Sequence, residues 1–168
     1  EGMEVPALRP RCQANSGATP FVALSAMFES QERDYGATLT RQGIYEQSVT
    51  PDLIVFTGNN TTIYSFGHLD LRKHGPIVLE APAGTLGGID NHWQYPLSDI
   101  GPFGPDKGKG GKFLILPPGY EGDVPEGYFV VQSDTLQNFY LLRGVPKNGD
   151  TQGAVDMLRT ARLYPLSE

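Results

Sequence analysis

Three lysines, Lys107, Lys109 and Lys112, lie in a glycine-rich stretch, residues 101–112, that can bind an anion. Five glycines and two prolines make it a series of turns, and flexible backbone amides beside ammonium groups hold a carboxylate or phosphate well. The spacing is not that of a P-loop, in which Ser or Thr follows Gly-Lys, because Phe113 follows Lys112. The stretch predicts either an anion-binding loop or a solvated turn whose lysines protect a sheet edge.

Histidines and aspartates form a second set of residues that could take part in catalysis or bind a metal. The set comprises His68, Asp70, His74, Asp90, His92 and Asp99. His68 and Asp70 are two residues apart and share one face of a strand, which suits an acid/base pair or metal ligands. No His-Glu-x-x-His signature accompanies them, and we expect neither a metal nor another cofactor. Whether the protein is an enzyme stays open.

Candidate nucleophiles have little support in the sequence. The single cysteine, Cys12, excludes an internal disulfide and has no neighbour that would stabilise a thiolate. Ser65 lies outside any Gly-x-Ser-x-Gly motif, and strand alternation puts it on the face opposite His68. No recognisable catalytic set follows from these residues.

Aromatic residues near both sets predict either a ligand pocket or a part of the core. They are Tyr64, Phe66, Trp93, Tyr95, Phe103 and Tyr120. The neighbouring lysines favour a pocket lined by Tyr64, Trp93 and Tyr95 and closed by residues 101–112.

The composition narrows the class of protein. The 168 residues carry a net charge of −6, which leaves no broad basic face for nucleic acid. No apolar stretch approaches the roughly 18 residues that a membrane-spanning helix needs. With 21 glycines and 14 prolines, the chain is typical of short strands joined by turns. We expect an arm over 1–18 and one mainly β domain over 19–168, an antiparallel β-sandwich or barrel with flanking helices.

Capping signals predict one helix near each end of the domain. Thr19 before Pro20 predicts a short helix that ends before Gly36, since a hydroxyl caps well and proline suits the first helical position. Apolar residues at helical spacing after Asp150 predict a C-terminal helix ended by Pro165.

Apolar runs bounded by turn residues predict the strands. These are expected at 53–56, 63–71, 77–79, within 86–97, and at 113–116 and 128–131. The runs 63–71 and 77–79 predict a hairpin-like unit. The run 139–142 fits a strand or a helix, and residues 34–50 look irregular.

Asn59 and Asn60 each begin a triplet that fits N-glycosylation. A polar turn with capping side chains explains the same residues, and we prefer that interpretation.

Several motifs resemble those of the DUF1254 family. They are residues 59–71, residues 75–82, the segment from Asp99 to Tyr128 with its Gly-Pro-Asp-Lys-Gly-Lys-Gly-Gly-Lys run, and the ending Leu163-Tyr-Pro-Leu166. The likeness covers about residues 20–166. It implies a β-rich sandwich or barrel with flanking helices, a periplasmic or secreted location, and a second β-rich domain of DUF1214 type as a partner.

The resemblance carries no catalytic residues, because the family name assigns no function. Thr61 stands where the family has an aspartate, so a role for that acid is not expected here. The chain stops at Glu168, where the second domain would begin, and this predicts a fragment, a stand-alone protein or one partner of a complex.

Three hypotheses follow. The first is a domain that binds a small anionic ligand or assembles with a partner, with no chemistry of its own. Its site comprises Tyr64, His68, Asp70, Trp93, Tyr95, Lys107, Lys109 and Lys112. The second is a hydrolase that uses Asp70, His68, Asp90 or Asp99. The third is a structural subunit of a homo-oligomer.

Overall fold

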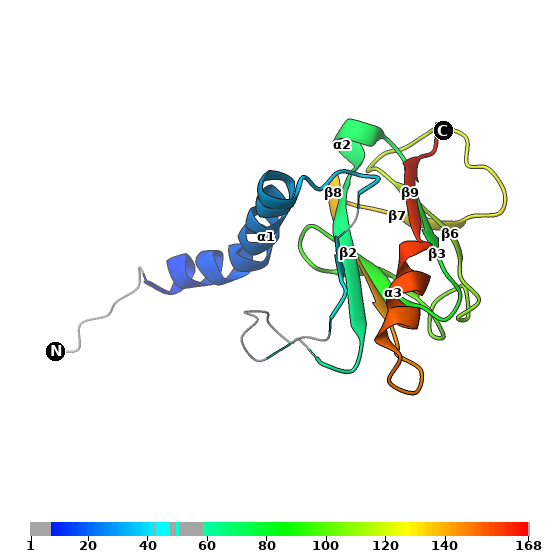
Figure 1. Cartoon of the computed structure of the whole chain (residues 1–168). Helices are drawn as coiled ribbons and strands as arrows, with labels where there is room; N and C mark the ends of the chain where they lie inside the picture. Colours follow the sequence, from blue (N-terminus) through cyan, green and yellow to red (C-terminus); the bar gives the residue numbers. More distant parts are fainter. Residues whose placement is uncertain (1–7, 42, 48–49, 51–58, 168) are drawn as a thin grey trace.

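The computed structural model describes residues 8–41, 43–47, 50 and 59–167, and within α1 the side chains from Gly17 onward. Two β-sheets pack face to face, and helices lie at both ends of the chain (Figure 1). The predicted class, mainly β with flanking helices, is confirmed, and the sheets form an open sandwich rather than a closed barrel. The predicted strand at 53–56 and the side chain of Cys12 lie outside the described part.

The first sheet is antiparallel, in the order β1-β2-β8-β4-β5. Its strands are β1 (Gly43–Tyr45), β2 (Ile63–Asp70), β8 (Gln137–Gly144), β4 (Leu86–Asn91) and β5 (Pro96–Ile100). The second sheet has the order β7-β6-β3-β9, with only β6 and β7 parallel. Its strands are β7 (Phe129–Gln132), β6 (Gly111–Leu116), β3 (Ile77–Ala81) and β9 (Arg162–Pro165).

Three helices complete the described part: α1 (Leu8–Tyr35), α2 (Leu71–His74) and α3 (Thr151–Arg159). None of them combines the length and the apolar character that crossing a membrane requires. The apolar stripe of α3 is buried against the sandwich.

Burial explains why the strands differ in pattern. Along β2, alternate residues from Ile63 to Leu69 are fully or nearly fully buried and face the second sheet, whereas those between them are only half buried. In β6, all residues from Phe113 to Leu116 are buried, because Tyr120, Tyr128 and other side chains cover the outer face of the second sheet.

The first helix differs from its prediction. It begins at Leu8, inside the stretch assigned to the arm, and Pro20 lies in its interior. Proline lacks the N–H that would bond the carbonyl four residues earlier, so it is tolerated where that carbonyl reaches water, and it bends the helix (Figure 1). The capping prediction at Thr19 was therefore wrong, while the predicted end before Gly36 is confirmed.

The predicted hairpin of 63–71 and 77–79 was also wrong, because β2 and β3 belong to different sheets. Asp70 ends β2 and caps α2: its Oδ1 accepts hydrogen bonds from the backbone N–H groups of Arg72 (3.0 Å) and Lys73 (3.2 Å). This one-turn helix carries the chain across to β3.

Other boundaries shifted for local reasons. The C-terminal helix ends at Arg159, and Pro165 lies in β9, an edge strand where a missing N–H is tolerated. The run 139–142 is strand, at the centre of β8, and the irregular region 34–50 contains the short strand β1.

Close approach of β4 and β8 gives a first prediction. A Cβ on Gly87 would lie 2.0 Å from the carbonyl oxygen of Leu141, so Gly87→Ala forces two central strands apart. We expect a loss of about 3 kcal/mol in the free energy of unfolding, measured by urea denaturation. Gly43→Ala in β1 is the control, because its Cβ would meet only Phe66 O at 3.6 Å and should change stability by less than about 0.5 kcal/mol. Equal losses in both variants would contradict the prediction.

Candidate functional site

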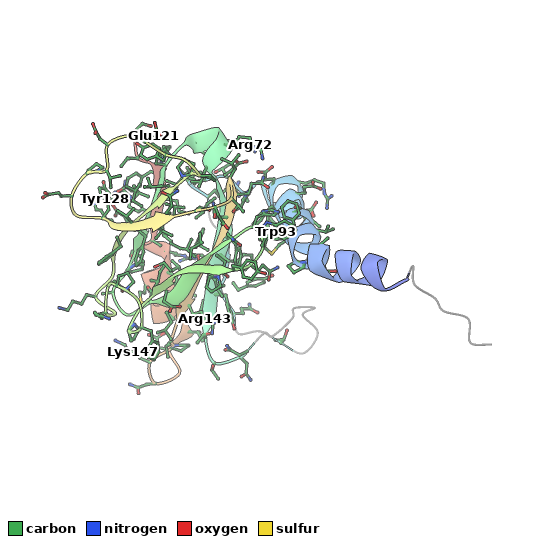
Figure 2. All side chains as sticks on the ribbon, turned by 180° about the vertical axis from the view of Figure 1, so that it is seen from behind. Arg72, Trp93, Glu121, Tyr128, Arg143 and Lys147 are labelled. Atoms are coloured by element: carbon green, nitrogen blue, oxygen red, sulfur yellow. The ribbon has the colours of Figure 1, made fainter. Side chains whose placement is uncertain are left out.

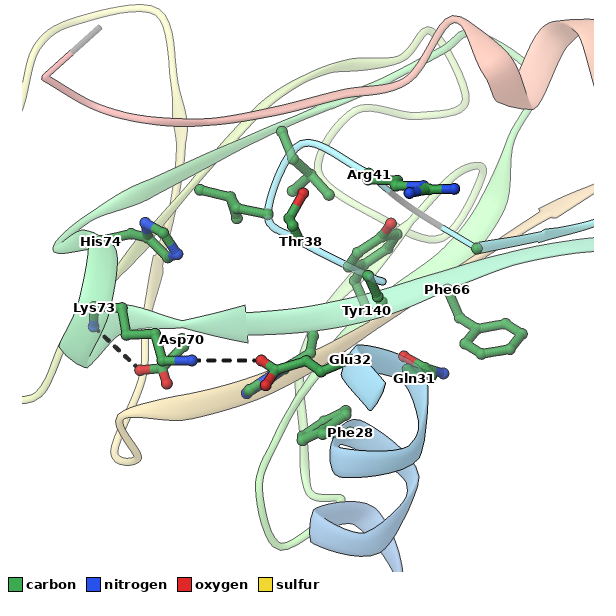
Figure 3. Close-up of a pocket in the computed structure, with 16 residues that line it drawn as sticks. Phe28, Gln31, Glu32, Thr38, Arg41, Phe66, Asp70, Lys73, His74 and Tyr140 are labelled. Atoms are coloured by element: carbon green, nitrogen blue, oxygen red, sulfur yellow. Dashed lines mark hydrogen bonds and ion pairs between the residues drawn. The ribbon is translucent and has the colours of Figure 1, made fainter. Parts of the chain in front are cut away.

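A cavity of about 330 Å³ lies where the C-terminal end of α1 and the segment after it meet the end of β2 (Figure 3). Its lining includes Phe28, Gln31 and Glu32 from α1, Thr38, Leu39 and Arg41 from the following segment, Phe66, Gly67, His68 and Asp70 from β2, Lys73 and His74 from α2, Tyr140 from β8 and Leu163 from β9. The cavity thus reaches from the outer side of the first sheet toward the core.

The absence of a side chain at Gly67 leaves space for the Tyr140 ring, which forms the buried wall of the cavity. Gly67 and Tyr140 are register partners in β2 and β8, and a Cβ on Gly67 would lie 2.7 Å from Cε1 of Tyr140. The Tyr140 ring therefore lies across Gly67. Burial raises the pKa of Tyr140, and its hydroxyl hydrogen-bonds Ser65, so the phenol stays neutral.

His68 is held as a neutral imidazole at the same wall. Its ring stacks on Phe28 of α1, with centroids 3.8 Å apart and planes 10° apart. Burial lowers the pKa of His68 to about 4, against the opposing attraction of Asp70 and Glu32. Its Nε2 is buried with no hydrogen-bond partner among the residues that the structure describes.

The charged side chains of the rim are unequally engaged. Lys73 Nζ lies 3.4 Å from Glu32 Oε1, which joins α2 to α1 (Figure 3). Asp70 accepts two backbone hydrogen bonds. No carboxylate of the described residues forms an ion pair with Arg41. Arg41 is exposed at the cavity and lies beside Gly36, at the C-terminal end of α1. Of the two cations described at the rim, Lys73 is paired with Glu32, and Arg41 is paired with none of the described carboxylates.

The predicted lysine loop, residues 101–112, does not line this cavity, and the carboxylate of Asp106 holds it in place. Asp106 is only 4% exposed, and its carboxylate accepts hydrogen bonds from Gly101 N (2.8 Å) and Gly110 N (3.2 Å). Lys107 and Lys109 are exposed to solvent. These contacts make the loop an ordered turn.

Lys112 belongs to a different cluster on the second sheet. Its Nζ lies 3.3 Å from Glu80 Oε1, and Tyr164 donates a hydrogen bond of 2.5 Å to the same oxygen. The hydrogen bond from Tyr164 and the one from Lys112 lower the pKa of Glu80 despite partial burial.

The predicted aromatic residues do not converge on the loop. Tyr64 lies under Arg143, whose Cζ is 5.8 Å from the ring centroid. Trp93 and Tyr95 lie in the turn between β4 and β5, and Trp93 contacts Phe21 of α1 at 4.8 Å (Figure 2). The loop follows Ile100 at the other end of β5, so this hairpin separates it from Trp93. Two further predicted aromatics, Phe103 (90% exposed) and Tyr120, lie away from the cavity lining.

The acidic and histidine set is divided in the same way. His68, Asp70 and His74 line the cavity, whereas Asp90 and Asp99 lie on β4 and β5. Burial raises the pKa of Asp90, and the nearby charge of Asp99 adds to this. Within the described ranges, no three His, Cys, Asp or Glu side chains are grouped closely enough to hold a metal ion.

Sequence reasoning missed most of the cavity wall. Arg41 stands in a stretch without periodicity, and the only signal for it is a cation between two glycines, Gly36 and Gly43, that mark turns. Tyr140 could have been found only from the pairing of β8 with β2, which places it opposite Gly67.

Taken together, the two sheets, the capped crossover and the cavity define a small β-sandwich domain with a pocket under its first helix. Residues 41–165 match the family described as "Protein of unknown function (DUF1254)", and the chain belongs to this family. Thr61, where that resemblance predicts an aspartate, donates its hydroxyl to Asn59 Oδ1 at 3.0 Å, and the same oxygen caps the turn before β2 by accepting the backbone N–H groups of Thr61 and Thr62.

No curated protein matches the chain. Among solved structures, the crystal structure of the VPA0106 protein from Vibrio parahaemolyticus, a structural genomics target, is similar with a TM-score of 0.66 and 18% sequence identity. The match covers 90% of this chain and 37% of that chain, so this chain spans little more than a third of the Vibrio protein. At this identity the likeness concerns the fold alone.

Removing the acid that holds the lysine loop tests whether the loop is architectural. Asp106→Ala leaves the N–H groups of Gly101 and Gly110 without their acceptor, and we expect a loss of about 2 kcal/mol in unfolding free energy. Amide hydrogen exchange should rise across 101–110. Lys107→Ala and Lys109→Ala are the controls, with changes below about 0.5 kcal/mol. A stable Asp106→Ala protein with unchanged exchange would show that the hydrogen bonds do not order the loop.

Proposed function

We propose that this domain binds a small organic anion in the cavity between α1 and β2, with Arg41 as the group that meets the anionic end. The observation that carries the proposal is a cavity of about 330 Å³ with a cation at its rim that pairs with no carboxylate of the described residues. A volume of this order suits a small ligand. A guanidinium presents two parallel N–H groups, which suits a carboxylate better than a point charge does.

The other lining residues support a ligand with an apolar body. Phe28, Leu39 and Leu163 supply apolar surface, and Phe28 and Leu39 are buried against the domain. The neutral imidazole of His68, whose Nε2 is buried, adds a weakly polar surface to this lining. Few polar groups around an apolar body is the usual composition of a ligand pocket.

The contacts favour binding over hydrolysis. Asp70 already accepts two backbone hydrogen bonds, and His68 stacks on an aromatic ring, so both side chains hold positions within the wall. Assembly with a second copy or with a DUF1214-type domain stays a prediction, as does a periplasmic or secreted location. Glycosylation at Asn59 or Asn60 also stays a prediction.

Benzoate is a suitable probe, because it joins a carboxylate to a ring that fits a cavity of this size. We expect saturable binding, followed by chemical shift changes at Arg41 and Tyr140 in NMR titrations. Arg41→Ala should weaken binding at least 10-fold, since a charge-assisted hydrogen bond contributes about 1.5–3 kcal/mol.

Two controls make the test specific. Lys109→Ala, an exposed cation outside the cavity, should leave the affinity for benzoate unchanged. Benzamide, which has the same shape without the charge, should bind more weakly than benzoate to the unaltered protein. Equal affinity for the two compounds, or full affinity in Arg41→Ala, would refute the assignment of Arg41.

A further inference from the structure

We infer that α1 is a latch on the first sheet that is released when His68 and His92 take up protons, and that its release opens the cavity. Release of α1 follows from the contacts of the helix alone, whereas its effect on a ligand rests on the function proposed above.

Two histidines lie beneath α1 and receive its aromatic side chains. Phe28 stacks on His68 at 3.8 Å, and Phe21 meets His92 edge-on with centroids 4.0 Å apart and planes at 64°. Phe28 and Leu24 are buried by this docking. Contacts between aromatic rings and imidazoles therefore hold the helix against the sheet.

The turn that carries His92 is held rigidly under the helix. Asn91 Oδ1 accepts hydrogen bonds from the backbone N–H groups of Trp93 (2.9 Å) and Tyr95 (3.0 Å), and His92 N–H donates to Thr135 Oγ1. His92 Nε2 lies 2.9 Å from Ser25 Oγ of α1, and Ser25 also donates to Phe21 O at 3.0 Å. The polar contact thus joins the helix to a fixed point of the sheet.

The hydrogen-bond inventory fits neutral imidazoles and not charged ones. His68 Nε2 and His92 Nδ1 are both buried and have no partner in the part of the chain that the structure describes. A protonated imidazole carries an N–H on each nitrogen, so protonation would leave a charged donor buried without an acceptor. Undocking of α1 exposes both rings to water and removes this cost.

The charges around the two rings give the direction of the pH dependence. Burial lowers the pKa of His68 to about 4. Lys73 of α2 and His92 act in the same direction, while Asp70 of β2 and Glu32 of α1 oppose them. Burial also lowers the pKa of His92, against the carbonyl of Phe21.

Because the pKa values of His68 and His92 are lower in the docked state than the pKa of free histidine, docking of α1 is strongest above pH 6.5. It weakens as the pH falls toward 4. For His68 alone the loss in the docking equilibrium between pH 6.5 and 4 is at most roughly 100-fold, the value reached when docking of α1 accounts for the whole lowering of its pKa.

Release of α1 changes the cavity because the helix supplies part of its wall. Phe28, Gln31 and Glu32 line it from α1, and the ion pair of Glu32 with Lys73 closes the rim. With α1 detached, these groups leave and His68 faces solvent. The latch would therefore couple acidification to ligand release.

The single tryptophan gives a direct readout, since Trp93 contacts Phe21 at 4.8 Å and is 43% exposed while α1 is docked. We expect the Trp93 emission to shift to longer wavelength, and amide exchange to rise over residues 21–33, between pH 6.5 and 4. Far-ultraviolet circular dichroism should show that the strands persist. The double variant His68→Phe/His92→Phe keeps aromatic rings at both positions and should lose the transition. His74→Gln, at the exposed third histidine, should keep it.

NMR titration of the imidazole carbons in the unaltered protein covers the case in which the double variant does not fold. His68 should titrate well below the usual range of histidine and His92 below it, together with the Trp93 shift. Constant Trp93 emission from pH 7 to 4, or titration of both His68 and His92 at the ordinary value of histidine, would overturn the latch. Neither measurement needs a ligand, so failure of benzoate to bind would refute the proposed function and leave the latch standing.

Discussion

The carboxylate of Asp70 is the interaction on which both the sandwich and its cavity depend. By accepting two backbone hydrogen bonds at the start of α2, it ends β2 and redirects the chain from the first sheet to the second. The same turn positions Lys73 for its ion pair with Glu32. A single capping residue thus joins the topology of the domain to the wall of the candidate site.

The two faces of the first sheet solve different physical problems. The inner face excludes water with residues such as Ile63 and Leu142, which are fully buried against the second sheet. The outer face lies under α1, which packs through Phe21 and Phe28 onto imidazoles. Apolar packing of the inner face is insensitive to pH, whereas packing onto imidazoles is not, because a buried histidine resists protonation.

Local signals in the sequence predicted much of this fold. Strand alternation over 63–69 and the apolar run at Phe113 were confirmed because each element buries the face that its pattern indicates. The start of α1 was not predictable from Thr19 and Pro20, since a proline usually begins a helix but here lies inside one, at the cost of a hydrogen bond and a bend. Capping preferences describe one turn, and they do not report how far a helix continues beyond it.

The candidate site was predictable only in part, because some of its residues are far apart in the sequence and meet only in the folded protein. The pair His68 and Asp70 follows from strand alternation and does line the cavity. The lysine loop drew attention by composition, but Asp106 uses the glycine amides that an anion would need. Arg41 and Tyr140 join the site through tertiary packing, which no local pattern encodes.

Binding of an anion and protonation of His68 are linked if both occur in this cavity. Burial, together with Lys73 and His92, disfavours the charged imidazole, and an anion bound at Arg41 in the same cavity would oppose them and raise the pKa of His68. By thermodynamic reciprocity, protonation of His68 would then strengthen the hold on the anion as long as α1 stays docked. Release requires that the cost of burying a charged imidazole under Phe28 exceed this gain. That cost is large, because His68 stacks on Phe28 and its buried Nε2 has no acceptor among the described residues for the N–H of the charged ring. The balance between docking of α1 and binding of an anion is therefore set by the two imidazoles under the helix, and only His68 also lines the cavity.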